Sequence, residues 1–171
     1  MGTIQLANTE FNEYYKQYID LAIHLPLLQG LADGMLETHS FFEGLPRDKH
    51  EFRYAEGKWT PKEILLHLID TERVFAYRAL QFARAENVEI RGFDQDEFAA
   101  NSNANLRTME ELLDEYIAVR TANIVLFTSF TEETMQRMGI ASNSPLSVRA
   151  AGYIICGHEK HHIAVINERY L

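Results

Sequence analysis

Three histidines lie close together near the end of the sequence, in the segment GHEKHH at residues 157–162. An α-helix turns by about 100° per residue, so His162 lies about 40° from His158, on the face that also carries apolar Ile154. His161 lies about 60° from His158 in the other direction, toward the edge of that face. Two imidazoles one turn apart can bind one ion at the usual nitrogen–metal distance of about 2 Å. The spacing therefore favours His158 and His162 as a pair of metal ligands.

Two other interpretations of this segment stay open. Each histidine can be a buried side chain that bonds a carbonyl or a carboxylate, although burying two of them without partners costs free energy. The segment also contains HExxH, in which Glu159 would be the general base of a metalloprotease. That class is the weaker alternative, because its third ligand would lie downstream of the motif and no His or Cys follows His162.

A third ligand would have to come from another helix. His67 is the best candidate, because it stands in the apolar stretch LLHLIDTE, two turns inside a well-capped helix start. Asp70 follows it by three residues and could orient its imidazole, act near the metal as a base, or be an ordinary polar residue of the helix. The other histidines lie in a polar segment or have no supporting pattern: His24, His39 and His50.

Composition and charge exclude several classes of protein. The chain has 171 residues, which suits one domain with a sizeable core. Its formal charge of −9 argues against nucleic-acid binding, which needs a basic surface. No apolar run is long enough to cross a membrane, and the N-terminus lacks the pattern of a signal peptide. A single cysteine, Cys156, precludes an internal disulfide, so we expect a cytoplasmic protein.

Helical periodicity dominates the sequence, and strand signals are scarce. The clearest helix start is TPKE, in which Thr60 can cap the helix, Pro61 fits its first turn and Glu63 completes a capping box. That helix should reach Ala85, and a short helix is expected within the polar loop at 86–106. Four long amphipathic helices in one domain predict an all-α protein built as a four-helix bundle. Further helices are predicted at 12–22, 27–44, 108–130 and 147–171, with a turn-rich connection at 131–147.

Two segments resemble the signatures of one family, the DinB/YfiT-like superfamily. YAEGKWTPKEILLHLIDTERVFAYRAL, at 54–80, resembles the second main helix of that family, and GHEKHHIAVINERYL, at 157–171, resembles its closing helix. GFDQDEFA and SVRAAGYII are similar to the branch that includes YfiT. The resemblance covers most of residues 25–171. The combination of W-T-x-x-E-x-x-x-H with a C-terminal H-x-x-x-H is far more specific than either half.

The resemblance implies a four-helix bundle with up-down-down-up helix order and a short extra N-terminal helix. It implies a single domain over residues 1–171, with residues 1–24 as an extension that packs on the bundle. YfiT-like members often carry a second histidine beside the ligand of the second helix, where this chain has Leu66. One divalent metal ion, nickel or zinc, is implied at three matching positions: His67, His158 and His162. His161 matches no ligand.

For function, the resemblance implies a bacterial enzyme that acts on a small molecule. Three neutral imidazoles leave a metal its full charge and an open position, which suits hydrolysis by water or transfer to a thiol. Some relatives are S-transferases or isomerases that use a low-molecular-weight thiol such as bacillithiol, and others are described only as metal-dependent hydrolases. We favour thiol transfer, because no general base besides Asp70 presents itself. The alternatives are a non-catalytic metal-binding bundle, active in stress response or protein contacts, and a metal-free bundle; the family also suggests a homodimer.

Several other residues are candidates for the surroundings of the site. Arg78 lies roughly in register with His67, three turns on, although an ion pair with an acidic neighbour is the favoured interpretation. Trp59 is expected to pack at the end of the bundle, and Cys156 points too far from His158 to reach a metal. Residues 92–98 can be a lid or a solvated loop. Three tyrosines can line the mouth, form a dimer face or simply pack: Tyr14, Tyr15 and Tyr18.

Overall fold

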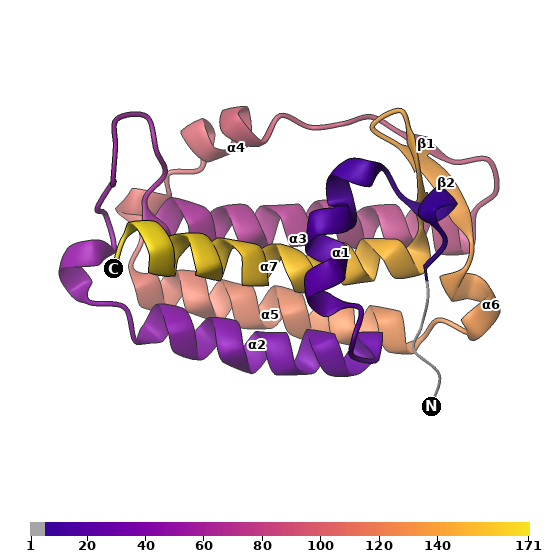
Figure 1. Cartoon of the computed structure of the whole chain (residues 1–171), viewed down its shortest axis with the longest axis horizontal. Helices are drawn as coiled ribbons and strands as arrows, with labels where there is room; N and C mark the ends of the chain where they lie inside the picture. The colour runs from indigo at the N-terminus through magenta and orange to yellow at the C-terminus, as the bar shows by residue number, and fades with distance from the viewer. Residues whose placement is uncertain (1–5) are drawn as a thin grey trace.

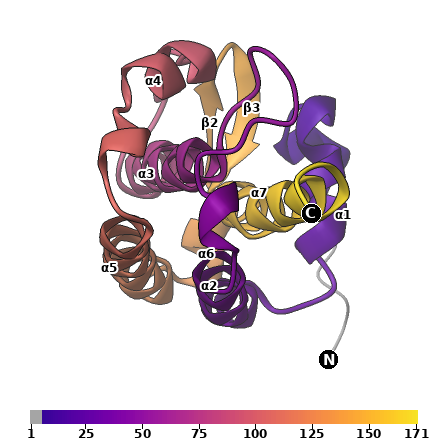
Figure 2. The same ribbon diagram turned by 90° about the vertical axis from the view of Figure 1, so that its left-hand side faces the viewer.

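Four long helices form the frame of the protein in a computed structural model, which describes residues 6–171 (Figure 1). α2 and α7 run in one direction along the long axis, and α3 and α5 run in the opposite direction. Seen end-on, they form a square in which α3 lies next to α5 and α2 lies next to α7 (Figure 2). This is the expected all-α bundle with up-down-down-up order. The four helices are α2 (Leu27–Glu43), α3 (Pro61–Arg84), α5 (Met109–Thr128) and α7 (Val148–Arg169).

Shorter elements fill the long connections that this helix order needs. None of the described helices is both long and apolar enough to cross a membrane. The short α-helices are α1 (Lys16–Ala22), α4 (Gln95–Asn101) and α6 (Glu132–Met135), and the strands are β1 (Glu89–Ile90), β2 (Met138–Ala141) and β3 (Ser144–Ser147). Turns of 3₁₀-helix cover Asn8–Glu10, Glu13–Tyr15, Arg47–Lys49 and Ala104–Leu106.

The start of α3 has the capping box that its sequence predicts. Thr60 Oγ1 accepts a hydrogen bond from the Glu63 amide at 3.1 Å, and Glu63 Oε2 accepts one from the Thr60 amide at 2.7 Å. Thr60 also donates to Asn105 Oδ1 at 2.8 Å, which ties the helix start to the segment before α5. These bonds satisfy amides that a helix end otherwise leaves unpaired, so they fix the first residue of α3 and with it the position of His67.

The connection predicted as turns at 131–147 instead contains two strands. β2 pairs with β3 in an antiparallel hairpin and with β1 in parallel. The two-residue turn between them consists of Ser142 and Asn143, both with positive φ (53° and 60°). Hairpins favour this backbone twist, but Asn-Gly is its usual sequence signal, which explains why the hairpin was missed. A Cβ at Gly139 would overlap the Phe82 ring, so glycine lets β2 lie directly on α3.

A polar layer divides the interior of the bundle into two apolar clusters. On α3 the first cluster takes residues 75–83 and the second takes residues 64–69. On α7 the first cluster takes residues 148–156, and the second is represented by Ile166. Between these stretches lie Glu72 on α3 and His158, Glu159 and His162 on α7. His67 stands within the 64–69 stretch and joins the polar layer through its contact with His158, and buried Arg120 of α5 joins it through Glu72 and Glu159. Buried polar groups gathered in one layer can bond to one another, which isolated ones cannot do.

The N-terminal helix α1 crosses α7 beside this layer. A Cβ at Gly157 would overlap the backbone carbonyl of Tyr18, so only glycine permits the close approach of the two helices. The approach brings the Tyr18 ring edge-on to His158 and His161, with ring centroids 5.2 and 5.3 Å apart. The N-terminal segment therefore forms one wall of the histidine site.

Candidate metal centre

Three histidines from two helices converge at one point of the polar layer. His67 comes from α3, and His158 and His162 come from α7. Their Nε2 atoms face one another: the atom of His158 lies 3.1 Å from that of His67 and 3.0 Å from that of His162. One ligand atom from each lies within 4.8 Å of the other two. The structure thus brings together the three residues that the sequence analysis singled out.

The chemistry of this donor set fits a bound cation. Each ring nitrogen of a neutral imidazole carries either one hydrogen or one lone pair, so Nε2 of His158 can donate or accept one hydrogen bond and satisfies only one of its two neighbours. One Nε2 then stays without a partner in an enclosed position, which is costly. A divalent ion that accepts three Nε2 lone pairs would satisfy all of them at once. The convergence is therefore poor as a hydrogen-bond cluster and suitable as a metal site.

Burial keeps these imidazoles in the neutral form that metal binding requires. It lowers the pKa of His67 to about 4. The pKa of His162 falls to about 3, because burial is reinforced by the neighbouring His67 and His161. Burial, followed by repulsion from the other three imidazoles, also holds the pKa of His158 well below its ordinary value. At neutral pH all three therefore present lone pairs.

The metal-free protein is expected to lose stability as the pH falls from about 6.5 to about 4. In the unfolded chain His67 titrates near its ordinary pKa of about 6.5, whereas its pKa in the fold is about 4. The unfolded state then binds more protons in this window, so acidification favours unfolding. Urea unfolding of chelator-treated protein across this pH range measures the effect. A His67→Gln variant should show a shallower fall, and an identical fall would contradict the prediction.

The orienting contact that the sequence suggested for Asp70 is made by another residue. Thr71 Oγ1 lies 3.4 Å from His67 Nδ1, the ring nitrogen that faces away from the other histidines. Asp70 instead lies 3.4 Å from the guanidinium of Arg73. Burial raises its pKa, and Glu115 adds to the rise while Arg73 opposes it. Asp70 therefore contacts the charged groups between α3 and α5, and not the imidazole of His67.

Glu159 of the HExxH segment points into a buried ion cluster. Its carboxylate accepts hydrogen bonds from Arg120 Nη2 at 2.6 Å and from the Tyr116 hydroxyl at 2.8 Å. Arg120 also donates from Nε and Nη2 to Glu72 at 2.8 and 2.9 Å. The bonds from Arg120 Nη2 and Tyr116 go to Glu159 Oε2, and Oε1 accepts one from Arg120 Nη1 at 3.3 Å. Both oxygens of Glu159 thus bond to groups other than the histidines, which removes the metalloprotease role considered for it. A cavity of about 10 Å³, the size of one water, lies between this cluster and His158.

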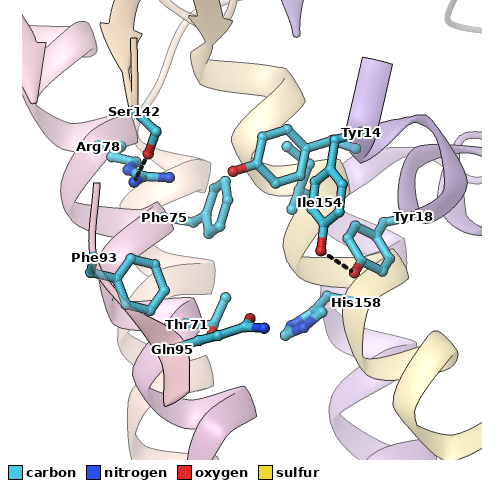
Figure 3. A pocket seen from close by; sticks show the side chains of 11 residues that line it. Tyr14, Tyr18, Thr71, Phe75, Arg78, Phe93, Gln95, Ser142, Ile154 and His158 are labelled. Carbon is cyan, nitrogen blue, oxygen red and sulfur yellow. Dashed lines mark hydrogen bonds between the residues drawn. The ribbon is translucent and has the colours of Figure 1, made fainter. Parts of the chain in front are cut away.

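Two cavities open on the histidines from different sides. The first, of about 130 Å³, reaches His158 and lies between α3, α7 and the N-terminal segment (Figure 3). The second, of about 210 Å³, reaches His162 and is bordered by Trp59 and Asp96. Five aromatic side chains line the first cavity: Tyr14, Tyr15, Tyr18, Phe75 and Phe93. The rest of its wall consists of apolar Ile154 and of polar side chains, which besides His158 are Thr71, Arg78, Gln95 and Ser142.

Some of the side chains expected around the site line its cavities or contact the histidines, and others lie elsewhere. The three tyrosines of the N-terminal segment line the first cavity, as one of the expected arrangements had it. Trp59 packs on the second apolar cluster and also lies against His67, with ring centroids 4.7 Å apart. The ion pair expected for Arg78 is wrong: its side chain bonds Ser142 Oγ at 2.9 Å. Cys156 is buried against Gly30, away from the site.

Curated relatives carry a metal-dependent description. A protein of Geobacillus thermodenitrificans named "putative metal-dependent hydrolase" is 30% identical over 177 residues, which cover 97% of this chain and 89% of that protein. A protein of Oceanobacillus iheyensis with the same description is 26% identical over 115 residues. That match covers 66% of this chain and 65% of the relative, so the chain spans just under two thirds of the length of that relative.

Solved structures show the same fold. YfiT from Bacillus subtilis, described as a "probable metal-dependent hydrolase with an unusual four-helix bundle topology", has a TM-score of 0.76 at 18% identity, over 98% of this chain and 92% of that one. A mycothiol-dependent maleylpyruvate isomerase has a TM-score of 0.67 at 12% identity, over 87% of this chain and 62% of its own. The sequence model of the DinB superfamily matches residues 36–166, well over half of the chain. With its four-helix order and this match, the chain is a member of the DinB superfamily.

Proposed function

We propose that the protein is a metal-dependent enzyme that joins a low-molecular-weight thiol to a small electrophilic substrate. The observation that carries the proposal is the convergence of His67, His158 and His162 Nε2 beside two cavities. The descriptions of the curated relatives support the dependence on metal, and the mycothiol-dependent structural neighbour supports the use of a thiol. Nickel and zinc are the ions that we expect, because both accept imidazole nitrogen.

A divalent ion held by these three imidazoles supplies Lewis-acid chemistry, because it lowers the pKa of a thiol or water that occupies its open position. The chain's own residues set the surroundings. Burial and the contact with Thr71 hold the His67 ring in a fixed orientation. Trp59, just before α3, packs against His67, and Tyr18 of α1 packs against His158. These two rings limit the access of water to the histidines. The aromatic walls of the first cavity suit an apolar substrate body.

Thiol transfer is preferred to hydrolysis because of what lines the first cavity. No described residue on its walls carries a carboxylate, so the cavity lacks the usual general base for activating water. A thiol would need no such base, because a divalent ion held by His67, His158 and His162 would favour its thiolate form. The walls of this cavity therefore suit a nucleophile that is already an anion.

Hydrolysis is the second candidate, and one observation favours it. Asp96, the second residue of α4, borders the cavity that reaches His162. A carboxylate there could accept a proton from water during attack on an ester or amide. An Asp96→Asn variant therefore separates the two candidates: it should abolish hydrolysis and leave thiol transfer unchanged.

The experiment uses zinc- and nickel-loaded protein with 1-chloro-2,4-dinitrobenzene and with p-nitrophenyl acetate. Each substrate is tested with and without cysteine, glutathione or bacillithiol. Turnover of the haloarene that needs both metal and thiol, and that survives Asp96→Asn, is the expected result. Thiol-independent ester cleavage that is lost in Asp96→Asn would replace transfer by hydrolysis. A metal-loaded protein that turns over neither substrate would favour a non-catalytic metal-binding bundle.

A further inference from the structure

Arg78 is a buried cation without an acidic partner. Its side chain is 1% exposed and lies in the wall of the first cavity. No described carboxylate lies within 4.0 Å of its guanidinium, and Ser142 Oγ is its one side-chain hydrogen-bond partner among residues 6–171. The Nε atom is enclosed and has no hydrogen-bond partner within the part of the chain that the structure describes. A buried charge in this state is costly unless another group arrives to pair with it.

The other fully buried arginine of the bundle provides the contrast. Arg120 is also 1% exposed, but each of its nitrogens donates to a carboxylate or a carbonyl oxygen, supplied by Glu72, Glu159 and Leu31. That is the pattern of a structural arginine, in which the fold itself satisfies the charge. The fold leaves Arg78 with one bond to a neutral hydroxyl, so its charge is available to a ligand.

Arg78 is nevertheless held in place. Its guanidinium lies over two aromatic rings: the Cζ atom is 4.8 Å from the centroid of the Phe75 ring and 5.9 Å from that of the Phe93 ring. Ser142, its hydrogen-bond partner, stands at the tip of the β2–β3 hairpin with a positive φ of 53°. The two-residue turn of the hairpin sets this backbone conformation, so the pairing of β2 with β3 fixes the position of Ser142. A planar donor fixed by two rings and a hydroxyl is ready to bind a planar anion without losing further freedom.

The position of Arg78 relates it to the histidines. Thr71, Phe75 and Arg78 follow one another along one face of α3 and form one wall of the cavity, while His158 faces them from α7 (Figure 3). Arg78 lies seven residues beyond Thr71, which corresponds to about 10 Å of helix. A small molecule can therefore contact the guanidinium at one end of the cavity and His158 at the other, with the aromatic rings in between.

We propose that Arg78 binds a carboxylate of the substrate and so makes small organic acids the substrate class of this site. This inference rests on the proposed function for the reaction at the histidines, but the binding step itself does not require it. The cavity of about 130 Å³ restricts the acid to a small body, on the scale of one aromatic ring. Arg78 is thus a specificity residue: it orients the acid so that the opposite end of the molecule faces the histidines.

Direct binding tests this proposal without an activity assay. Benzoate and acetate are titrated calorimetrically into metal-loaded protein, beside their uncharged counterparts benzamide and acetamide. The parent should bind each acid at least about tenfold more tightly than its amide, as a charged hydrogen-bond pair predicts. Arg78→Met should abolish this preference, and Ser142→Ala should weaken it less. Arg91→Met removes an exposed positive charge from the nearby 89–95 segment and should change nothing.

Stability and metal content of the same samples make each outcome decisive. Arg78→Met should unfold at the same denaturant concentration as the parent or at a higher one, because it removes an uncompensated buried charge. Destabilisation with an unchanged preference for acids would make Arg78 structural and overturn the proposal. Equal affinity of the parent for acid and amide, including no measurable binding of either, would also overturn it.

The proposal and the proposed function can fail separately. If the protein takes up neither zinc nor nickel but still binds acids through Arg78, the inference about Arg78 is supported and the proposed metal-dependent function is contradicted. If Arg78→Met leaves acid binding intact and removal of the metal abolishes it, the carboxylate binds at the histidines. That result would overturn this inference and leave the proposed function untouched.

Discussion

Replacing His158 with alanine is expected to reduce bound divalent metal from one equivalent per chain to almost none. His158 is central to the site, since its Nε2 lies about equally far from His67 Nε2 and His162 Nε2, at 3.1 and 3.0 Å. Loss of a contact that merely supports a ligand costs about 10–100-fold in metal affinity, so loss of a ligand itself should exceed that range. Elemental analysis of untagged protein, purified without a nickel column, measures the effect.

His161→Ala is the matched control for this experiment. His161 lies on the same helix, between the two ligands in sequence, and its ring centroid is 5.2 Å from that of His162. It does not belong to the group of converging nitrogen atoms, so its replacement should leave the metal content unchanged. Equal metal loss in both variants, or equal retention in both, would contradict the site as assigned. Circular dichroism of each variant establishes that the bundle has formed.

Arg120→Met is expected to lower the free energy of unfolding by about 3–5 kcal/mol. Arg120 bridges Glu72 of α3 and Glu159 of α7, and all three side chains are buried. Its removal would leave two buried carboxylates, whose remaining side-chain donors among the described residues are Tyr116 for Glu159 and Asn123 for Glu72. Burying an unpaired charge costs far more than a well-partnered pair contributes, so the loss should be large. Urea unfolding at neutral pH measures it.

Arg73→Met is the matched control, because Arg73 also joins α3 to α5. Its side chain is 47% exposed and pairs with Glu115 at 2.6 Å. Exposed pairs contribute about 0–1 kcal/mol, so this variant should remain close to the parent. If Arg120→Met cost no more than Arg73→Met, the buried cluster would not hold the three helices together as its geometry indicates.

Local sequence was sufficient for three features that depend on neighbours within one helix. The capping box at Thr60 and Glu63 involves residues three apart, so the start of α3 could be read directly. The shared face of His158 and His162 follows from helical periodicity, and the apolar surroundings of His67 marked it as inward-facing. These relations are set by helix geometry, which does not change with the rest of the fold.

The surroundings of the site could not be read in this way. Thr71 and Asp70 stand four and three residues after His67 on the same helix, so helix spacing places both near its ring and does not choose between them. In the structure Asp70 lies beside Arg73, which also pairs with Glu115 of α5, and Thr71 contacts the ring. An ion pair was expected for Arg78 because the chain is rich in acidic residues. The sequence shows how many acidic residues there are, but not which of them lie close to the Arg78 guanidinium.

The sequence by itself determined the four helices, the family and the three histidines as ligand candidates. Tertiary structure decided that Gly157 admits the carbonyl of Tyr18, that Arg120 takes both buried glutamates, and that Arg78 faces a cavity. Ser142 reaches Arg78 across 64 residues, and Glu159 reaches Arg120 across 39. Helix geometry carries no information on contacts over such separations, because they depend on how every intervening helix and loop packs.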